Sequence, residues 1–206
     1  MVNHASRRLI LASGSLSRRQ LLQAAGLAFD VVPADVDERA LEPQLTLKGD
    51  AHAIAVARAL AAAKACDVSR RYPDAIVIGA DQTLNIAGEA ILLHKPADLA
   101  AATRQLQSLR GRTHWLTSAV ALAEAGSVVW SSEARACMTM RDFSNSFVDN
   151  YLARLGPAVA TSVGCYQLEG LGIQLFEAIE GDYFTILGLP LLPILAELRR
   201  RKVIPT

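Results

Sequence analysis

The chain has 206 residues, of which 51% are hydrophobic and 20% are charged, and its formal net charge is +1. This composition excludes an intrinsically disordered chain. The near-zero net charge argues against a dedicated nucleic-acid-binding protein, because such proteins usually carry a basic excess.

The first half of the chain is expected to alternate strands and helices. The expected elements are a buried strand at 9–12, a helix near 17–25, a strand at 29–32, a loop at 33–49, a helix to about residue 68 and a buried parallel strand at 75–79. Ser15 or Ser17 is suited to cap the first helix, and Asp50 to cap the second, because their side-chain oxygens accept hydrogen bonds from first-turn N–H groups.

The second half adds a pair of strands between helices. The expected elements are a helix from Asp98 to 109, strands at 115–123 and 128–140 that turn at Gly126, a helix from Ser144 to 155, a strand at 173–179 and a helix at 190–201. Alternating strands and helices with an inserted two-strand ribbon predict an α/β fold with a mixed sheet, in one domain spanning residues 1–206.

The cysteines and the apolar stretches indicate the compartment. Cys66, Cys137 and Cys165 are far apart and form no C-x-x-C pair. They are therefore expected to be free thiols in a reducing compartment. No signal peptide is visible, and the longest charge-free apolar stretch, at 183–196, is too short to span a bilayer. These features predict a soluble cytoplasmic protein.

The segment Ser13-Gly14-Ser15-Leu16-Ser17-Arg18-Arg19 joins the first strand to the first helix. Backbone N–H groups at a helix N-terminus bind anions, and arginine adds a bidentate donor for phosphate. Arginines at this end oppose the helix dipole, and a bound anion would offset that cost. The alternative is a capped helix whose arginines are solvated.

Asp81 follows the buried strand, within Gly79-Ala80-Asp81-Gln82-Thr83. Sites in α/β sheets form at the carboxyl ends of strands. A carboxylate there is able to hold a metal ion or to act as a general base. The alternative is an aspartate that caps a helix or a turn.

Two lysines and an acidic group are further candidates. Lys95 stands beside Pro96 and is either a point charge for phosphate or a surface turn residue. Lys64 lies on an almost all-alanine helix face and is either a site residue or a lysine whose stem covers apolar surface. The acidic residues at 35–38, which include Glu38, either supply a metal ligand or belong to a solvated loop. Together, cations from three segments and carboxylates from two suit metal-assisted attack on a polyphosphate.

These residues belong to an ordered series of motifs. The series runs Leu11-Ala12-Ser13-Gly14-Ser15-x-x-Arg18-Arg19, Asp37-Glu38, Lys64-Ala65, Gly79-Ala80-Asp81-Gln82, Lys95-Pro96, Gly111-Arg112-Thr113-His114, Gly164-x-Tyr166-x-x-Glu169-Gly170 and Gly188-Leu189-Pro190-Leu191. It resembles the Maf family of nucleoside triphosphate pyrophosphatases, once called septum formation inhibitors, over residues 9–200. The branch that it most resembles acts on 7-methyl-GTP.

The resemblance implies a hydrolase acting on acid anhydrides, which converts modified or non-canonical nucleoside triphosphates to monophosphate and pyrophosphate as house-cleaning. It implies a twisted mixed sheet with flanking helices and two lobes around a cleft, as in the inosine triphosphatase-like fold. It also implies a divalent metal cation, Mg or Mn, as cofactor. The expected partners are the nucleotide and a second copy in a homodimer, with no membrane and no stable nucleic-acid binding.

The resemblance also assigns roles by position. Asp81 matches the general base, and Glu38, together with Asp81, matches the metal-binding carboxylates. Phosphate-contacting positions are matched by Ser13, Arg18, Lys64 and Lys95. Positions linked to base selection are matched by Gln82 and Glu169, and both residues are those of the 7-methyl-GTP branch.

Two positions depart from the family pattern. Ser17 stands where the 7-methyl-GTP branch has an aromatic residue, so the base would lose a stacking partner. Ser162 stands where many members carry a lysine, so one phosphate contact would be missing.

The alternative function is a non-catalytic regulator of septum formation and cell division that acts through a binding partner, as the older family name suggests. A complete set of site residues favours the enzyme. Release of pyrophosphate from a panel of nucleotides distinguishes the two functions.

Overall fold

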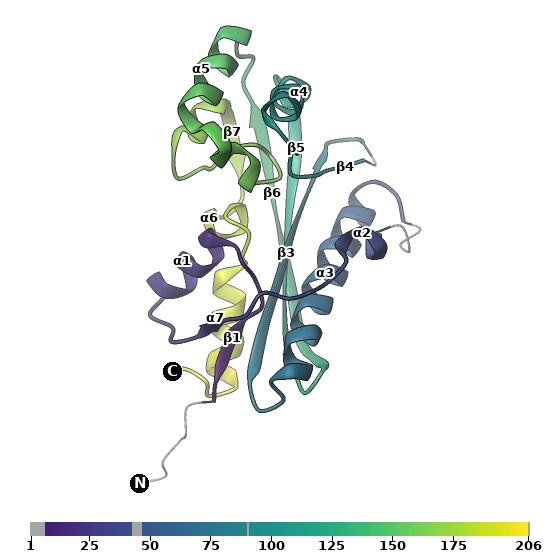
Figure 1. Ribbon diagram of the computed structural model, residues 1–206, viewed down its shortest axis with the longest axis vertical. Coiled ribbons are helices and arrows are strands. Elements are labelled where there is room, and N and C mark those ends of the chain that lie inside the picture. Colours follow the sequence, from purple (N-terminus) through teal and green to yellow (C-terminus); the bar gives the residue numbers. More distant parts are fainter. Residues whose placement is uncertain (1–6, 43–46, 90, 206) are drawn as a thin grey trace.

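A seven-stranded mixed sheet with helices on both faces forms the centre of the molecule (Figure 1). The structure is a computed structural model and describes residues 7–42, 47–89 and 91–205. The strands are β1 (Leu9–Leu11), β2 (Asp30–Val31), β3 (Ile76–Ile86), β4 (Leu92–Leu93), β5 (Thr113–Glu124), β6 (Ser127–Met140) and β7 (Phe176–Glu180). Their order is β2-β1-β3-β5-β6-β7, with β4 paired to β3. This architecture confirms the predicted α/β fold with a mixed sheet.

The helices differ widely in length. They are α1 (Leu16–Ala24), α2 (Glu38–Leu41), α3 (Gly49–Arg71), α4 (Leu99–Leu109), α5 (Asn145–Leu155), α6 (Tyr183–Ile186) and α7 (Leu191–Arg200), with 3-10 helices η2 (Gly156–Thr161) and η3 (Leu171–Leu175). The sequence does not predict α2 and α6. The expected loop at 33–49 contains α2, and residues 43–46 of that loop lie outside the described residues.

The sheet has a gap along one edge of β3. Strand β1 pairs in parallel with β2 and β3, whereas β3 pairs antiparallel with β4 and β5. The pairing with β1 ends at Ile78, and the pairing with β4 begins at Leu84. Between these residues, no described strand lies beside β3 on that side. The gap therefore opens between the ends of β1 and β4.

Two apolar cores pack against one face of the sheet. The upper core in Figure 1 joins Leu84 and Leu116 to helices α4 and α5. The lower core joins Ile78 and Val120 to helices α1 and α7. Because β3 and β5 run through both cores, the molecule has two lobes that share one sheet.

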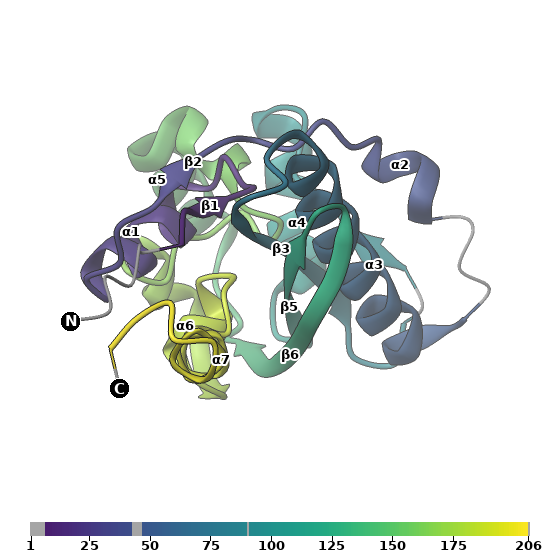
Figure 2. The same ribbon diagram turned by 90° about the horizontal axis from the view of Figure 1, so that it is seen from below.

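Helix α3 covers the opposite face of the sheet (Figure 2). Ala57, Ala61 and Ala65 of this helix pack against alanines of β5. On β3, a Cβ atom added to Gly79 would lie 2.2 Å from the carbonyl oxygen of Ala61. Small residues on both elements let the helix approach the strand closely, and this brings Lys64 against β3.

Three predicted helix caps are confirmed and one is wrong. The confirmed caps are Ser15, Asp98 and Ser144. Lys48 precedes α3 in place of the predicted Asp50. Asp50 instead accepts a hydrogen bond from Asn85 at 2.9 Å and forms an ion pair with Arg135 at 2.8 Å. These two partners come from the sheet, so the local sequence of the helix does not reveal them.

Two predicted strands have different bounds. Strand β3 continues to Ile86, beyond the predicted end at residue 79, because β5 pairs with it along nearly its whole length. The predicted strand at 173–179 is wrong in its first half, where Leu171–Leu175 form a 3-10 helix. The extension of β3 has consequences for the site, because it places Asp81 inside the strand.

All three cysteines are free thiols, as predicted. Burial raises the pKa of Cys165 to about 12, so this thiol is not a reactive nucleophile. Among the described residues, no helix is both long enough and apolar enough to cross a membrane.

Candidate active site

Asp81 lies in the middle of β3 and points toward helix α3. Its Oδ1 atom is 2.6 Å from Lys64 Nζ, and the same Nζ is 2.6 Å from Glu38 Oε1. The Asp81 residue is 7% exposed, whereas the Glu38 side chain is 54% exposed. Lys64 therefore joins a buried carboxylate to a carboxylate that reaches solvent.

The charges around Asp81 have opposing effects on its protonation. Burial raises the pKa of Asp81, and the positive charges of Lys64 and Arg18 act in the other direction. Burial also lowers the pKa of Arg18, against the effect of Asp81 and Glu38. A raised pKa favours proton uptake, so Asp81 is suited to act as a general base.

Arg18 joins three segments beside the gap in the sheet. Its Nη1 donates to Ser13 Oγ at 3.0 Å and to the carbonyl oxygen of Ala80 at 2.9 Å. Its Nε donates to the carbonyl oxygen of Gly188 at 2.8 Å. Within the described part of the chain, Nη2 makes no hydrogen bond. A fixed guanidinium with free donors suits the binding of a phosphate group.

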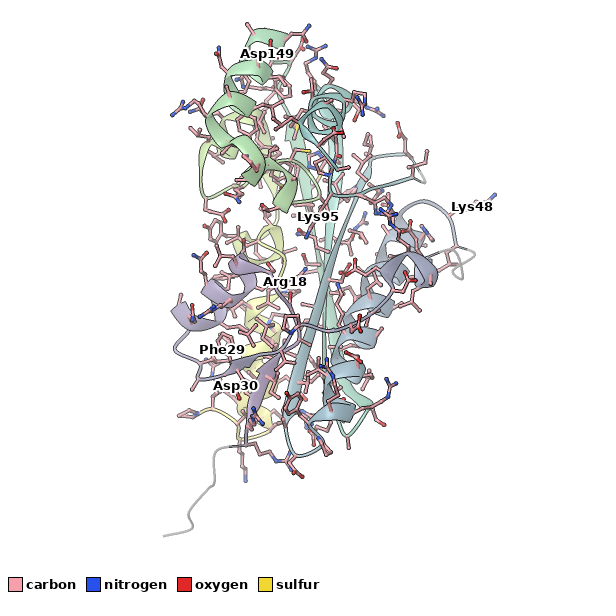
Figure 3. The ribbon with its side chains drawn as sticks, in the orientation of Figure 1. Arg18, Phe29, Asp30, Lys48, Lys95 and Asp149 are labelled. Carbon is pink, nitrogen blue, oxygen red and sulfur yellow. The ribbon has the colours of Figure 1, made fainter. Side chains whose placement is uncertain are left out.

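Lys95 follows β4, and Ser13 follows β1, so these residues mark the two ends of the gap in the sheet edge. Figure 3 shows Lys95 above Arg18 in the middle part of the molecule. The Lys95 side chain is exposed and has no hydrogen bond or ion pair to the described residues. The structure thus brings Ser13, Arg18, Lys64 and Asp81 together and leaves Lys95 at the rim.

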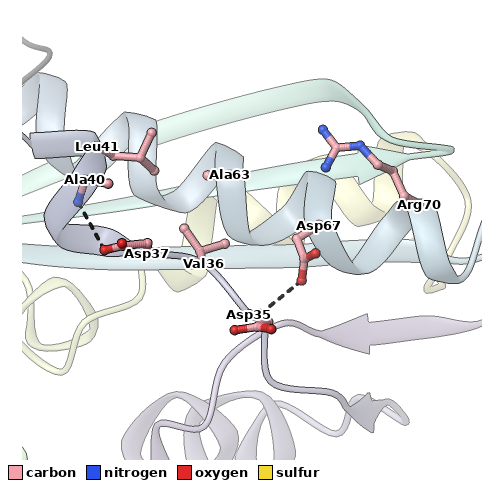
Figure 4. Close-up of a pocket in the computed structure, with 8 residues that line it drawn as sticks. All are labelled: Asp35, Val36, Asp37, Ala40, Leu41, Ala63, Asp67 and Arg70. Atoms are coloured by element: carbon pink, nitrogen blue, oxygen red, sulfur yellow. Dashed lines mark hydrogen bonds between the residues drawn. The ribbon is translucent and has the colours of Figure 1, made fainter.

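One hydrogen bond ties the segment that carries Glu38 to α3, and a second caps α2 within the segment (Figure 4). Asp67 Oδ2 accepts a bond from the backbone N–H of Asp35 at 3.0 Å. Asp37 Oδ1 accepts one from the N–H of Ala40 at 3.1 Å. An open groove of about 350 Å³ lies between this segment and α3. These contacts keep Glu38 within reach of Lys64.

Gln82 points to the face of the sheet opposite Asp81, because side chains alternate along a strand. Its Nε2 donates to Ser118 Oγ at 3.0 Å and to the carbonyl oxygens of Thr185 at 3.0 Å and Ile186 at 3.1 Å. No motif in the sequence points to Ser118 or Thr185. The available signal was weak: each is a polar residue within an otherwise apolar segment.

The loop that carries Glu169 is tied to β5 through buried side chains. Tyr166 Oη lies 2.7 Å from His114 Nε2. Ser162 Oγ accepts a hydrogen bond from the Tyr166 N–H at 3.0 Å and donates to its carbonyl oxygen at 2.7 Å. Glu169 is exposed, with no hydrogen bond or ion pair to the described residues. The loop is therefore anchored, and the Glu169 carboxylate remains free for a ligand.

Acid should weaken this anchor through His114. Burial lowers the pKa of His114 to about 3. In the unfolded chain His114 binds a proton near pH 6.5. Its contribution to the unfolding free energy is therefore fully present above that pH and is lost as the pH falls toward 3. Between pH 7.5 and 4.5 we expect His114 to remove about 2–3 kcal/mol of unfolding free energy. Denaturant unfolding of the wild type and His114→Gln at both pH values measures this; equal acid losses in the two proteins would contradict it.

Asp81 and Glu38 fit a divalent metal ion that brings further ligands of its own. Among the described residues, no three acidic, histidine or cysteine side chains gather as a metal site. Mg²⁺ commonly binds through one or two carboxylates together with substrate phosphates and water. The two carboxylates around Lys64 match that number of protein ligands, and Lys64 Nζ lies 2.6 Å from an oxygen of each.

Comparison with known proteins decides the family. Residues 8–201 match the family described as Maf-like protein. The chain belongs to the Maf family. This Maf-family chain is 54% identical over 197 residues to the 7-methyl-GTP pyrophosphatase of Brucella abortus biovar 1 (strain 9-941), covering 96% of this chain and 98% of the relative. It is 47% identical over 197 residues to the nucleoside triphosphate pyrophosphatase of Granulibacter bethesdensis, with the same coverage.

A solved structure of a HAM1 protein from Coxiella burnetii overlaps more loosely with this Maf-family chain. The identity is 16% and the TM-score is 0.42, over 65% of this chain and 72% of the other. The match of the family and its full-length relatives confirms the resemblance drawn from the ordered motifs.

Proposed function

We propose that this Maf-family chain hydrolyses nucleoside triphosphates to nucleoside monophosphate and pyrophosphate, as house-cleaning of the nucleotide pool. The observation that carries the proposal is the buried Asp81 carboxylate, in contact with Lys64 and close enough to Arg18 for their charges to interact. Relatives with matching names cover nearly the whole chain, which supports the same assignment.

In the proposed reaction, Asp81 takes a proton from a water molecule whose oxygen attacks the α-phosphorus. The bond between the α-phosphorus and the bridging oxygen breaks, and pyrophosphate leaves with that oxygen. Lys64 and Arg18 offset the negative charge that develops on the phosphate oxygens. Lys95 and Ser13, at the two ends of the gap, hold the phosphate chain in place.

Glu38 and Asp81 would hold the divalent cation, Mg or Mn. When bound, such an ion neutralises part of the triphosphate charge and polarises its oxygens. Lys64 lies 2.6 Å from both carboxylates and keeps them close together before the nucleotide arrives.

A nucleotide panel tests the proposed function directly. We expect pyrophosphate release from at least one modified or ordinary nucleoside triphosphate in the presence of Mg²⁺ or Mn²⁺, and little after chelation. Coupled detection of pyrophosphate measures it. If no nucleotide of the panel releases pyrophosphate with either metal, the non-catalytic regulator is favoured.

We further propose that the preferred nucleotide is 7-methyl-GTP. Guanine presents N–H donors at N1 and N2, and a carboxylate accepts from both. Methylation at N7 gives the base a positive charge, which strengthens its attraction to the free Glu169 carboxylate. Ser17 supplies no stacking surface, and a missing base–aromatic stack costs about 1–3 kcal/mol, so discrimination should be weaker than with an aromatic residue.

Glu169→Gln should lower the preference for 7-methyl-GTP over other nucleotides more than it lowers turnover on those others. The reason is that Gln keeps the size of the side chain and removes its charge. The ratio of kcat/KM values for 7-methyl-GTP and GTP measures the effect. Glu177→Gln is the matched control, because Glu177 is an exposed glutamate on β7. If UTP or dTTP proves the best wild-type substrate by tenfold or more, Glu169 does not select the base this way.

A homodimer in the cytoplasm and the absence of stable nucleic-acid binding remain predictions. Three free thiols suit a reducing compartment. Light scattering after size-exclusion chromatography measures the oligomeric state.

A further inference from the structure

Polar side chains separate the two apolar cores on the face of the sheet opposite α3. On β3, Gln82 stands between Ala80 of the lower core and Leu84 of the upper core. Directly opposite Gln82 on β5 is Ser118. Thr185 of α6 completes the group. We call Gln82, Ser118 and Thr185 the polar belt.

The polar belt is closed by hydrogen bonds within the protein. Gln82 Nε2 faces Ser118 Oγ and the carbonyl oxygens of Thr185 and Ile186, at 3.0–3.1 Å. Ser118 Oγ in turn donates to the Thr185 carbonyl oxygen at 2.8 Å. Two carbonyl acceptors require the amide nitrogen at this position, so the orientation of the Gln82 amide is determined. Ser118 and Thr185 are fully buried and have no surface to offer a nucleotide.

The belt reaches Arg18 through the turn that follows α6. The N–H of Gly188 donates to the Thr185 carbonyl oxygen at 3.0 Å, the same oxygen that binds Gln82 and Ser118. Gly188 has a φ of +93°, so the turn favours glycine there. The carbonyl oxygen of Gly188 then accepts the Arg18 Nε–H at 2.8 Å.

We propose that the polar belt positions Arg18 for catalysis by fixing the Gly188 carbonyl, an inference that rests on the proposed function of the site. The Arg18 guanidinium has its Nε and Nη1 donors held by the protein, so its orientation depends on where those acceptors lie. Gln82 acts through α6 and Arg18, because its amide N–H groups are already bound, and this role differs from the base selection that the family resemblance implies for it. Its loss should affect every nucleotide alike.

Ser118→Ala tests the proposal, since this side chain is buried and cannot touch substrate. We expect kcat to fall about tenfold with each nucleotide of the panel, the effect of one buried hydrogen bond, while KM changes little. The ratio of kcat/KM between nucleotides should stay within twofold of wild type. Thr117→Val is the matched control: Thr117 is an equally buried neighbour on β5, and its hydroxyl has no hydrogen-bond partner among the described residues.

A double-mutant cycle separates positioning from general damage. If the belt acts through Arg18, Ser118→Ala combined with Arg18→Lys should be no slower than Arg18→Lys alone. If the two substitutions lower kcat by factors that multiply in the double variant, the proposal is overturned. A wild-type kcat in folded Ser118→Ala would overturn it as well. Gln82→Met provides a second variant if Ser118→Ala does not fold, with the same uniform loss expected.

A spectroscopic test does not depend on activity. The Arg18 Nε–H resonance of ¹⁵N-labelled protein, assigned by its loss in Arg18→Lys, should shift in Ser118→Ala and stay in place in Thr117→Val. An unmoved resonance in Ser118→Ala contradicts the proposal. If no nucleotide releases pyrophosphate while the resonance shifts, the coupling to Arg18 stands and the proposed function fails.

Discussion

Asp81→Asn is expected to lower turnover at least about 100-fold while the protein remains folded. General-base catalysis contributes about 10²–10⁴-fold, and an amide cannot take the proton from the attacking water. Asn keeps the size of the side chain, so packing against α3 should survive. Lys64 retains Glu38 as an ionic partner. Steady-state pyrophosphate release with saturating nucleotide and metal measures the loss.

Asp74→Asn is the matched control for charge removal. Asp74 is an exposed aspartate just before β3, so its substitution removes the same charge without reaching the site. Turnover of this control should equal that of the wild type. A folded Asp81→Asn protein with near wild-type turnover would remove Asp81 from the chemistry and leave it as a structural partner of Lys64.

The pH dependence of turnover follows from the surroundings of Asp81. Because burial raises its pKa, the ionised form that takes the proton is depleted at a higher pH than for an exposed aspartate. Turnover should therefore fall on acidification, and the fall should begin above the usual range of an aspartate. Lys64 and Arg18 limit how far the pKa rises.

The sequence predicts the membership of the site better than its geometry. Ser13, Arg18, Lys64 and Asp81 were identified by their motifs, and the structure brings them together. What local patterns do not show is the length of β3. A strand that ends at residue 79 would leave Asp81 and Gln82 in one loop. Pairing with β5 continues the strand, so the two neighbours point to opposite faces.

Contacts between distant segments explain the other differences. The caps at Ser15, Asp98 and Ser144 are predictable because donor and acceptor lie three residues apart. Asp50 has the same local appearance, but Arg135 and Asn85 bind its carboxylate from the sheet. Helix α6 has a local cap of the predictable kind, at Asp182, but its four residues are too few for a helical pattern. Gln82 and Ser118 also bind its carbonyl groups from the sheet. Partners this distant along the chain cannot be predicted from local sequence spacing.

Gly79→Ala should destabilise the fold by at least about 3 kcal/mol, near or above the upper end of the usual range for overpacking. An added Cβ would lie 2.2 Å from the Ala61 carbonyl oxygen and 2.5 Å from the Ala65 backbone nitrogen. Both atoms belong to the backbone of α3, so no side-chain rotation relieves the contact. The helix would have to move away from β3.

Denaturant unfolding of Gly79→Ala measures the loss. Gly14→Ala is the control for the change of residue type, because nothing lies within 4 Å of a Cβ at that position. Adding Ala65→Gly should not restore stability, since it trims a side chain and leaves both backbone contacts. Stability within about 1 kcal/mol of wild type would show that α3 moves easily at this point.

Displacement of α3 would also carry Lys64 away from Asp81, so any folded fraction of Gly79→Ala should turn over nucleotide more slowly than wild type. The small residue at position 79 therefore serves the site as well as the fold, because the approach of α3 to β3 sets the distance between the ammonium and the carboxylate.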